Sequence, residues 1–387
     1  MKILMMADTP PDPNRGAAGT EVQTARGLRA LGHDVDTIWA GDLGRRIEHG
    51  NLHLLLELPR TYERSAVHAL RARHYDVVHV NQPHGFRAAR TIHRLSPGTV
   101  FIHRSHGLEL NVEETLDPWR ARFGEEERSL ARRAASSLLA RGLARHSHAI
   151  AREADGHIVS SSLDADFLAE RLRVDRARIA VIPQAAPDDY TSTPPPAFTP
   201  ERFRRVLHVA QFAFFKAPMI TAQAIELLPM PVTWVCDRAH HATIRAMLSE
   251  DANARLELMH WTSQDELRAI YDAHGLFLFP SFFEGFGKSF LEAMSRGLVV
   301  IASDAGAMRD VMRDGTDGML VPVGDAEALA AAVLALDFER AVRISTAAAE
   351  TARQYSWARV ARETAAFYED LVKSRSREYS PRNSRAT

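Results

Sequence analysis

Short runs of consecutive apolar residues alternate with amphipathic stretches along the whole chain. The strands predicted from these runs lie at 2–7, from 32 on, at 75–81, 100–107 with a polar turn at the end, 155–161 and 179–185, and then at 205–210, 232–235, 276–279 and 299–304. Runs that are apolar throughout, instead of alternating, are typical of strands covered on both faces in a parallel sheet. The pattern therefore predicts an α/β protein.

Helical periodicity fills much of the chain between these runs. The predicted helices lie at 21–31, 125–151, 219–228, about 287–297, 325–336 and 355–373. Pro218 stands in the first turn of one helix, where proline is tolerated, and Gly297 closes another. Ser263 and Glu266 have the spacing of a capping box, so a further helix is expected to begin there.

The clearest break in composition lies between Asp189 and Pro200, where Pro194, Pro195 and Pro196 follow one another. Successive prolines make a chain extended and stiff, so this segment is interpreted as a linker between two domains. A chain of 387 residues is long enough for two domains with cores of their own.

Composition and charge exclude several classes of protein. The net charge is −1, so no global field attracts nucleic acid or an anionic membrane. Cys236 is the only cysteine, which excludes an intramolecular disulfide and fits a reducing compartment. The opening apolar run is too short for a signal peptide, and no run approaches the ~20 residues of a membrane span. A cytoplasmic protein is expected.

Lysine is rare in this chain. It occurs only at Lys2, Lys216, Lys288 and Lys373, and arginine supplies every other basic position. Two of the four stand beside turns marked by glycine or proline. Because lysine is a compact point charge suited to phosphate, Lys216 and Lys288 are interpreted as ligands of an anion, with solvated surface charge as the alternative.

The stretch from Leu276 to Gly297 carries the strongest functional signal. A buried strand ends at Pro280, and a loop with Glu284 and two glycines leads into a helix. A glycine loop at a helix N-terminus binds anions, because free N–H groups and the positive end of the helix dipole face the ligand. Carboxylates repel phosphate, so the glutamates indicate a ligand that also carries hydroxyls, as a sugar and a ribose do.

This stretch resembles the signature of the retaining glycosyltransferases of the large GT-B family 4. The matching residues are Pro280, Ser281, Glu284, Gly285, Phe286, Gly287, Glu292, Ala293, Met294 and Gly297. The resemblance implies two Rossmann-like parallel-sheet domains that face an interdomain cleft. It also implies transfer of a sugar from a nucleotide diphosphate sugar to an acceptor hydroxyl, without a metal or other cofactor.

The resemblance further implies how the chain is divided and which residues act. The expected parts are an acceptor-side domain at 1–190, a Pro-rich linker at 191–202, a nucleotide-sugar-binding domain at 203–355, a helix at 356–373 that crosses back to the first domain, and a polar, disordered tail at 374–387. The expected catalytic residues are His106 and Glu284, and the expected donor-binding residues are Gly19, Lys216, Gly285, Phe286, Gly287, Lys288, Ser289 and Glu292.

Three positions depart from the family pattern. Ala18-Gly19 stands where adjacent glycines are usual, Gln184-Ala185 replaces an Asn-Gly turn, and Gln211 aligns with an arginine that holds the diphosphate. Gln211 and Ala185 keep a second interpretation open, a catalytically weak scaffold or sugar-binding protein. A related epimerase or phosphorylase is a third interpretation.

Other charged clusters have two interpretations each. Asp34 with Asp36 and Asp164 with Asp166 could indicate a metal, but no His/Cys cluster joins them, and no metal is predicted. The segment from Arg120 to Arg152 contains eight arginines and three glutamates. That segment is interpreted either as a docking surface, for the inner face of an anionic membrane or for the acceptor, or as a solvated surface. The acceptor, whether glycan, lipid-linked sugar or small metabolite, is not identified by any motif.

Overall fold

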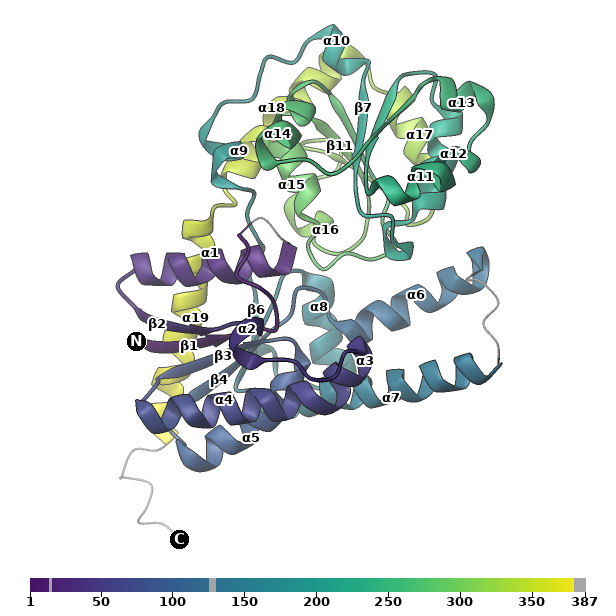
Figure 1. Cartoon of the computed structure of the whole chain (residues 1–387). Coiled ribbons are helices and arrows are strands. Elements are labelled where there is room, and N and C mark those ends of the chain that lie inside the picture. Colours follow the sequence, from purple (N-terminus) through teal and green to yellow (C-terminus); the bar gives the residue numbers. More distant parts are fainter. Residues whose placement is uncertain (14–15, 125–129, 379–387) are drawn as a thin grey trace. The chain divides into compact units, whose positions relative to one another are not determined.

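The computed structural model describes residues 1–13, 16–124 and 130–378 (Figure 1). It divides the chain into two compact units. Unit 1 holds Met1–Pro183 together with the chain from Trp357 on, and unit 2 holds Gln184–Ser356. Each unit is built around its own parallel sheet.

Unit 1 contains, within the described residues, a sheet of six parallel strands in the order β2-β1-β3-β4-β5-β6. The strands are β1 (Lys2–Met6), β2 (Asp34–Ile38), β3 (Val77–Asn81), β4 (Val100–Arg104), β5 (Gly156–Val159) and β6 (Ile179–Val181). Along β3 successive side chains point to opposite faces. Val78 and Val80 enter the core beneath the helices α4 (Leu58–Ala72) and α5 (Phe86–Leu95), whereas His79 faces α19 (Trp357–Glu378).

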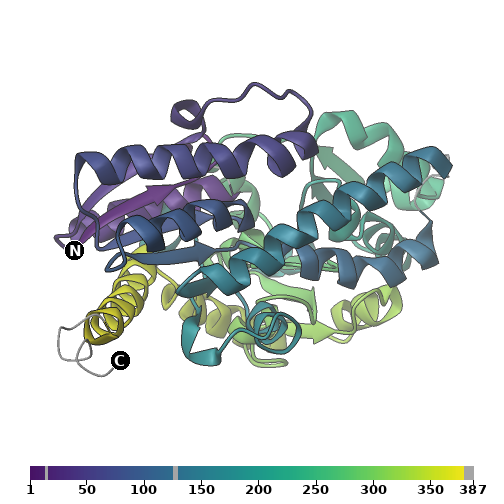
Figure 2. The same ribbon diagram turned by 90° about the horizontal axis from the view of Figure 1, so that it is seen from below.

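Helices cover both faces of this sheet (Figures 1 and 2). The described helices of unit 1 are α1 (Gly16–Ala30), α2 (Ala40–Leu43), α3 (Gly50–Leu52), α4 (Leu58–Ala72), α5 (Phe86–Leu95), α6 (Glu109–Phe123), α7 (Leu130–Glu153), α8 (Ser162–Asp166) and α19 (Trp357–Glu378). α4 packs against α5 on one face, and α1 packs against α19 on the other. Gly27 permits the close contact of α1 with α19, because an added Cβ would lie 2.5 Å from the Cβ of Ala361.

Unit 2 contains a second sheet, in which the described strands run in the order β12-β11-β10-β7-β8-β9. They are β7 (Val206–Val209), β8 (Val232–Val235), β9 (Leu256–Met259), β10 (Leu276–Phe279), β11 (Val299–Ser303) and β12 (Met319–Val321), all parallel. This is the order of a Rossmann sheet, in which the chain direction across the sheet reverses between the first and fourth strands, here β7 and β10.

The helices of unit 2 also lie on both faces of its sheet. They are α9 (Asp188–Ser192), α10 (Pro200–Phe203), α11 (Pro218–Leu227), α12 (His241–Ala246), α13 (Glu250–Ala254), α14 (Gln264–Asp272), α15 (Lys288–Ser295), α16 (Met308–Val311), α17 (Ala326–Leu334) and α18 (Phe338–Arg353). The core beneath α14, α15 and α18 is aromatic, with Phe277, Phe279 and Phe290 at its centre. The capping box of Ser263 and Glu266 begins α14 as predicted.

The Pro-rich segment is part of unit 2, which differs from the predicted boundary at 190 and linker at 191–202. Two buried arginines hold it there. Arg296 donates to the carbonyl oxygens of Tyr190, Thr193 and Pro194, and Arg202 donates to those of Pro196 and Ala197. These bonds satisfy carbonyls of an extended segment that forms no strand, so the segment packs on its unit.

The last helix extends further than predicted. α19 runs to Glu378, so residues 374–378 are helical and do not belong to the tail predicted at 374–387; residues 379–387 lie outside the described part of the chain. Tyr368 is fully buried in unit 1 and bonds to Nδ1 of His79. Among the described residues no helix is long and apolar enough to cross a membrane.

Candidate active site

The loops that follow β7 and β10 meet at the point where the strand order of unit 2 reverses. In open α/β sheets ligands bind at this point, outside the carboxyl ends of the strands. The two loops are joined directly, because the backbone N–H of Phe282 donates to the carbonyl of Phe215 at 2.8 Å. The β7 loop carries Lys216 and the β10 loop carries Glu284, so both predicted residues lie at the switch point.

Local backbone geometry places Lys216. A short 3-10 turn spans Phe214–Lys216, and Ala217 then adopts φ 50°, in the left-handed region, before Pro218 opens α11. Few residues other than glycine adopt that conformation without strain, so the turn is held by its surroundings. The ammonium group lies 5.0 Å from the centroid of the Phe279 ring and 5.4 Å from that of Phe215, within the range of cation–π attraction.

Lys216 and Glu284 form a buried ion pair. Their Nζ and Oε1 atoms lie 2.5 Å apart, and the two side chains are 15% and 5% exposed. The hydroxyl of Ser281 donates to the same carboxylate oxygen at 2.7 Å. Sequence analysis singled out both charged residues but gave them separate ligands. In the structure each is the partner of the other.

Two glycines leave room around Glu284. Gly287 has φ 88°, and a Cβ on it would lie 3.3 Å from Oε2 of Glu284 and 2.8 Å from the Phe279 ring. A Cβ on Gly306, which follows β11, would lie 2.0 Å from the carbonyl oxygen of Glu284. Only glycine fits at Gly306, so the approach of the β11 loop fixes the backbone that carries the glutamate.

α15 begins directly after this loop, with Gly287 as its N-cap. The orphan N–H groups of its first turn and the positive end of its dipole therefore lie beside the Glu284 loop. Lys288 and Ser289 are the first two residues of the helix and are half-buried. Phe286 is 2% exposed and packs on Phe290, so its side chain belongs to the core and only its backbone faces the loop.

Glu292 lies one turn further along α15. It is 8% exposed, and the hydroxyl of Tyr271 donates to its Oε2 atom at 3.0 Å. Burial raises the pKa of Glu292, although the bond from Tyr271 and the charge of Lys288 act in the opposite direction. Such a carboxyl group is well placed to bond to ligand hydroxyls, which can donate to it and accept from its protonated form.

His106 lies in unit 1, in the turn after β4, as predicted. Its Nε2 atom lies 2.8 Å from Oε1 of Glu21, a residue of α1 that is 1% exposed. Nε2 of His79 lies 3.3 Å from the other carboxylate oxygen, and Nε of Arg104 lies 3.8 Å from Oε1. Burial alone would raise the pKa of Glu21, but these cationic and donor partners outweigh it and hold that pKa well below its usual range.

Sequence analysis missed Glu21 as a site residue. The available signal was a carboxylate on the inward face of α1, between the buried residues Thr20 and Val22, because buried glutamates are rare unless they are paired. The predicted helix at 21–31 leaves Gly19 outside it. α1 begins at Gly16, so Gly19 lies inside the helix, where an added Cβ would lie 2.3 Å from the carbonyl oxygen of Pro13. The absence of a side chain at Gly19 therefore allows the backbone at Pro13 to approach the helix.

The acidic residues considered as possible metal ligands contact other groups of the protein. Asp34 and Asp36 both pair with Arg73, and Asp164 lies in the first turn of α8 with Ser161 as the N-cap.

Gln211, which stands where the family has an arginine, is exposed at the start of the β7 loop. Arg120 pairs with Glu113 and Asp117, whereas the side chains of Arg128, Arg132 and Arg133 lie outside the described residues. Among the described residues, no three His, Cys, Asp or Glu side chains form a metal-binding group.

Two family models match consecutive parts of the chain. The model described as "Glycosyltransferase Family 4" matches residues 15–189, and the model described as "Glycosyl transferases group 1" matches residues 204–337. The chain belongs to glycosyltransferase family 4. This confirms the family predicted from the Glu284 stretch.

Individual relatives of this family 4 member are similar over shorter stretches. A phosphatidyl-myo-inositol mannosyltransferase of Mycobacterium leprae is 45% identical over 97 residues, which cover 24% of this chain and 26% of that protein. The matches to this and three further curated relatives span 23–32% of the relatives' own length.

Solved structures confirm the predicted fold class. Sucrose-phosphate synthase from Thermosynechococcus elongatus has a TM-score of 0.74 at 21% identity, covering 97% of this chain and all of that chain. HepE of Anabaena, solved in complex with UDP and glucose, has a TM-score of 0.65 at 15% identity, covering 95% and 99%. The two Rossmann-like units of this family 4 member are therefore those of the GT-B fold.

Proposed function

We propose that the protein is a retaining glycosyltransferase, which moves a sugar from a nucleotide diphosphate sugar to an acceptor hydroxyl. The observation that carries this proposal is the pairing of Lys216 with Glu284 at the switch point of unit 2, beside the N-terminus of α15. A cation and helix N–H groups suit a diphosphate, and a carboxylate suits sugar hydroxyls. Groups that can bind the diphosphate and a group that can bind the sugar thus lie next to each other.

Donor binding would replace the contact between these two residues. The diphosphate competes for Lys216, and the sugar hydroxyls compete for Glu284, which Ser281 continues to hold in place. Glu292 then binds the ribose hydroxyls, with Tyr271 fixing one of its oxygens. In the free protein, Lys216 and Glu284 neutralise each other's charge. Because the donor offers each of them a new partner, their pairing does not block the site.

In the proposed reaction the bond between the anomeric carbon and the β-phosphate oxygen breaks, while a bond to the acceptor oxygen forms on the same face. The acceptor proton passes to the leaving phosphate. Lys216, Lys288 and the N–H groups at the start of α15 stabilise the charge that develops on that phosphate. His106, held by Glu21, orients the sugar.

The proposal assigns the diphosphate charge to lysines and N–H groups, with neither a metal nor another cofactor as a partner. Turnover should then persist in excess EDTA, and a requirement for added Mg²⁺ or Mn²⁺ would contradict this part. The acceptor hydroxyl belongs to a glycan, a lipid-linked sugar or a small metabolite.

The first test is thermal unfolding with UDP-, GDP- and ADP-sugars. A donor at 100 times its dissociation constant stabilises its unit by about 2.7 kcal/mol. We expect this shift with one nucleotide in the wild type and in the surface control Glu327→Gln, and its loss with Lys216→Met. Glu284→Gln should abolish transfer, and the anomeric configuration of the product, read by NMR, tests retention. If no nucleotide sugar stabilises the wild type, the scaffold interpretation replaces this one.

A further inference from the structure

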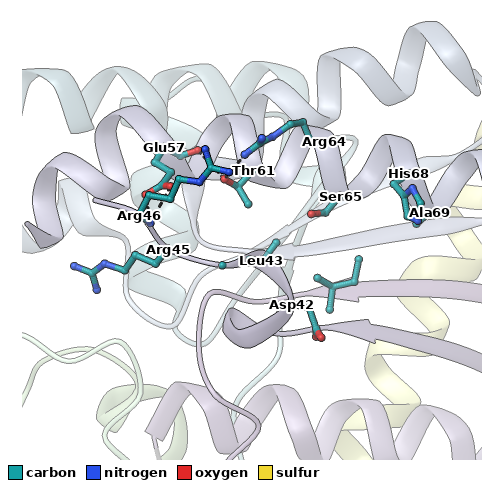
Figure 3. Close-up of a pocket in the computed structure, with 12 residues that line it drawn as sticks. Asp42, Leu43, Arg45, Arg46, Glu57, Thr61, Arg64, Ser65, His68 and Ala69 are labelled. Atoms are coloured by element: carbon teal, nitrogen blue, oxygen red, sulfur yellow. Dashed lines mark hydrogen bonds between the residues drawn. The ribbon is translucent and has the colours of Figure 1, made fainter. Parts of the chain in front are cut away.

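A pocket of about 700 Å³ opens in unit 1 beside the carboxyl end of β2 (Figure 3). α4 forms one wall, and the segment from α2 to residue 46 forms the other. The lining residues are Ile38, Asp42, Leu43, Gly44, Arg45, Arg46, Glu57, Thr61, Arg64, Ser65, His68 and Ala69. Its volume lies within the roughly 300–1,000 Å³ that is usual for sites of small molecules. None of the catalytic or donor-binding residues predicted from the sequence lines this pocket.

The loop that forms this second wall is fixed in place by Glu57. Its carboxylate accepts from the backbone N–H of Arg46 at 3.0 Å and that of Ile47 at 2.9 Å, and it lies 2.9 Å from Nδ1 of His53. This carboxylate is thus committed to the loop. Asp42 is committed in the same way, because it accepts from the backbone N–H of Trp39 at 2.8 Å. Both acidic residues of the pocket are occupied with backbone donors.

The arginines of the pocket differ in their partners. Arg45 donates to the carbonyl oxygens of Ile47 and Glu48, and in Figure 3 it points away from the pocket. Arg46 and Arg64 extend toward each other near Thr61 (Figure 3). Neither of their guanidinium groups forms an ion pair with a described carboxylate; Nη2 of Arg64 lies 3.3 Å from Oγ1 of Thr61. Two like charges in one pocket repel each other unless an anion lies between them.

α4 adds hydroxyl groups to this arrangement. Thr61 and Ser65 are separated by one helical turn, so both hydroxyls stand on the face of the helix that lines the pocket. The Ser65 hydroxyl can donate to and accept from a polyol, whereas the Thr61 hydroxyl already donates to the carbonyl oxygen of Glu57 at 3.2 Å and can only accept. Ile38, Leu43 and Ala69 supply apolar surface between them. The pocket therefore offers a cationic end, a polar wall and an apolar floor.

We propose that this pocket binds the acceptor of the reaction, and that the acceptor is a polyol carrying a phosphate group. The guanidinium groups of Arg46 and Arg64 hold the phosphate, since arginine binds phosphate oxygens in pairs and two arginines match its charge of about −2. Thr61 and Ser65 bind the neighbouring hydroxyls. The assignment as an acceptor site rests on the proposed glycosyl transfer, whereas the anion site itself stands on the pocket alone.

The test compares Arg46→Gln and Arg64→Gln with Arg71→Gln, which removes an exposed arginine from the same helix outside the pocket. The probes are inorganic phosphate, glycerol 3-phosphate, and phosphatidylcholine vesicles with or without phosphatidylglycerol. Each pocket variant should weaken binding about tenfold or more, because a charge-assisted hydrogen bond is lost, and Arg71→Gln should bind as the wild type does. Unchanged unfolding temperatures would show that the variants are folded.

The outcomes separate the sources of the phosphate. Binding of glycerol 3-phosphate that the pocket variants lose supports a free phosphorylated acceptor. Binding only to the phosphatidylglycerol vesicles, lost in the same variants, supports a lipid headgroup. Equal binding by all variants, or no binding of any probe to the wild type, overturns the proposal. Nucleotide-sugar binding, measured in parallel, reports on unit 2 alone, so a failure of glycosyl transfer is distinguished from a failure of this pocket.

Discussion

Oε1 of Glu21 and Nε2 of His106 lie 2.8 Å apart, although 85 positions separate them in the sequence. Glu21 comes from the second turn of α1 and His106 from the turn after β4, so one hydrogen bond joins two elements of unit 1. Because Glu21 is buried and also faces His79 and Arg104, its position is fixed by the core. Glu21 is therefore a positioning residue for His106.

Replacing Glu21 with glutamine should lower kcat/KM by about ten- to a hundredfold, because a misplaced catalytic group costs up to about that factor. The loss should be absent when His106→Ala is already present, since both changes remove one functional unit. Glu170→Gln, on the surface of unit 1, should have no effect. Equal losses from Glu21→Gln in both backgrounds would contradict the positioning role.

Removing one partner of the Lys216–Glu284 pair should destabilise unit 2. In Lys216→Met the buried carboxylate keeps only the Ser281 hydroxyl, and breaking a buried pair costs about 3–5 kcal/mol. The double variant Lys216→Met/Glu284→Gln should lose less than the two single changes together. Urea unfolding measures both. Lys373→Met, which breaks the exposed pair with Glu369, is the matched control and should leave the midpoint unchanged.

The raised pKa of Glu292 makes the stability of unit 2 depend on pH. The folded state holds the proton more tightly than the unfolded state, so the free energy of unfolding should fall as pH rises from the ordinary pKa of 4.5 toward the raised one. Glu292→Gln should flatten this slope. Denaturant midpoints measured across that range test it, and Glu350→Gln on the surface of α18 is the control. A slope that persists in Glu292→Gln would assign it to another group.

Arg296→Lys should destabilise unit 2 and expose residues 191–200 to proteases. Arg296 donates to Asp272 and to the carbonyls of Tyr190, Thr193 and Pro194, and an ammonium group cannot reach all of them. Leaving buried carbonyls unpaired costs about 1–3 kcal/mol each. Limited proteolysis followed by mass spectrometry measures the effect. Arg204→Lys, at an exposed position, should be cut as slowly as the wild type.

Patterns that are local in sequence predicted the structure well. The apolar run Leu276–Phe279 that ends at a proline is β10, and the helix expected from Gly287 is α15. Both could be predicted because the repeat of apolar residues in a strand or helix involves only residues close in sequence. Four of the longer helices, α4, α5, α6 and α18, and the strands β9 and β12 were not predicted. In α6 the signal is weakened by Pro118, since proline ordinarily interrupts a helix.

Features that depend on distant partners could not be predicted. The three prolines at 194–196 have the composition of a linker, yet Arg202 and Arg296 bind the carbonyls around them, and carbonyl oxygens leave no signature in the sequence. The Glu21–His106 bond and the Lys216–Glu284 pair likewise join residues whose proximity follows only from the sheet order.

The chain leaves unit 1 after Pro183 and returns to it at Trp357. A ribosome therefore releases most of unit 1 long before it makes α19, whose Tyr368 pairs with buried His79 and whose Ala361 packs on Gly27. Until then the face of the first sheet that α19 covers carries α1 but lacks α19, while unit 2 has already been made. The half of the protein that is translated first is the half whose folding is completed last.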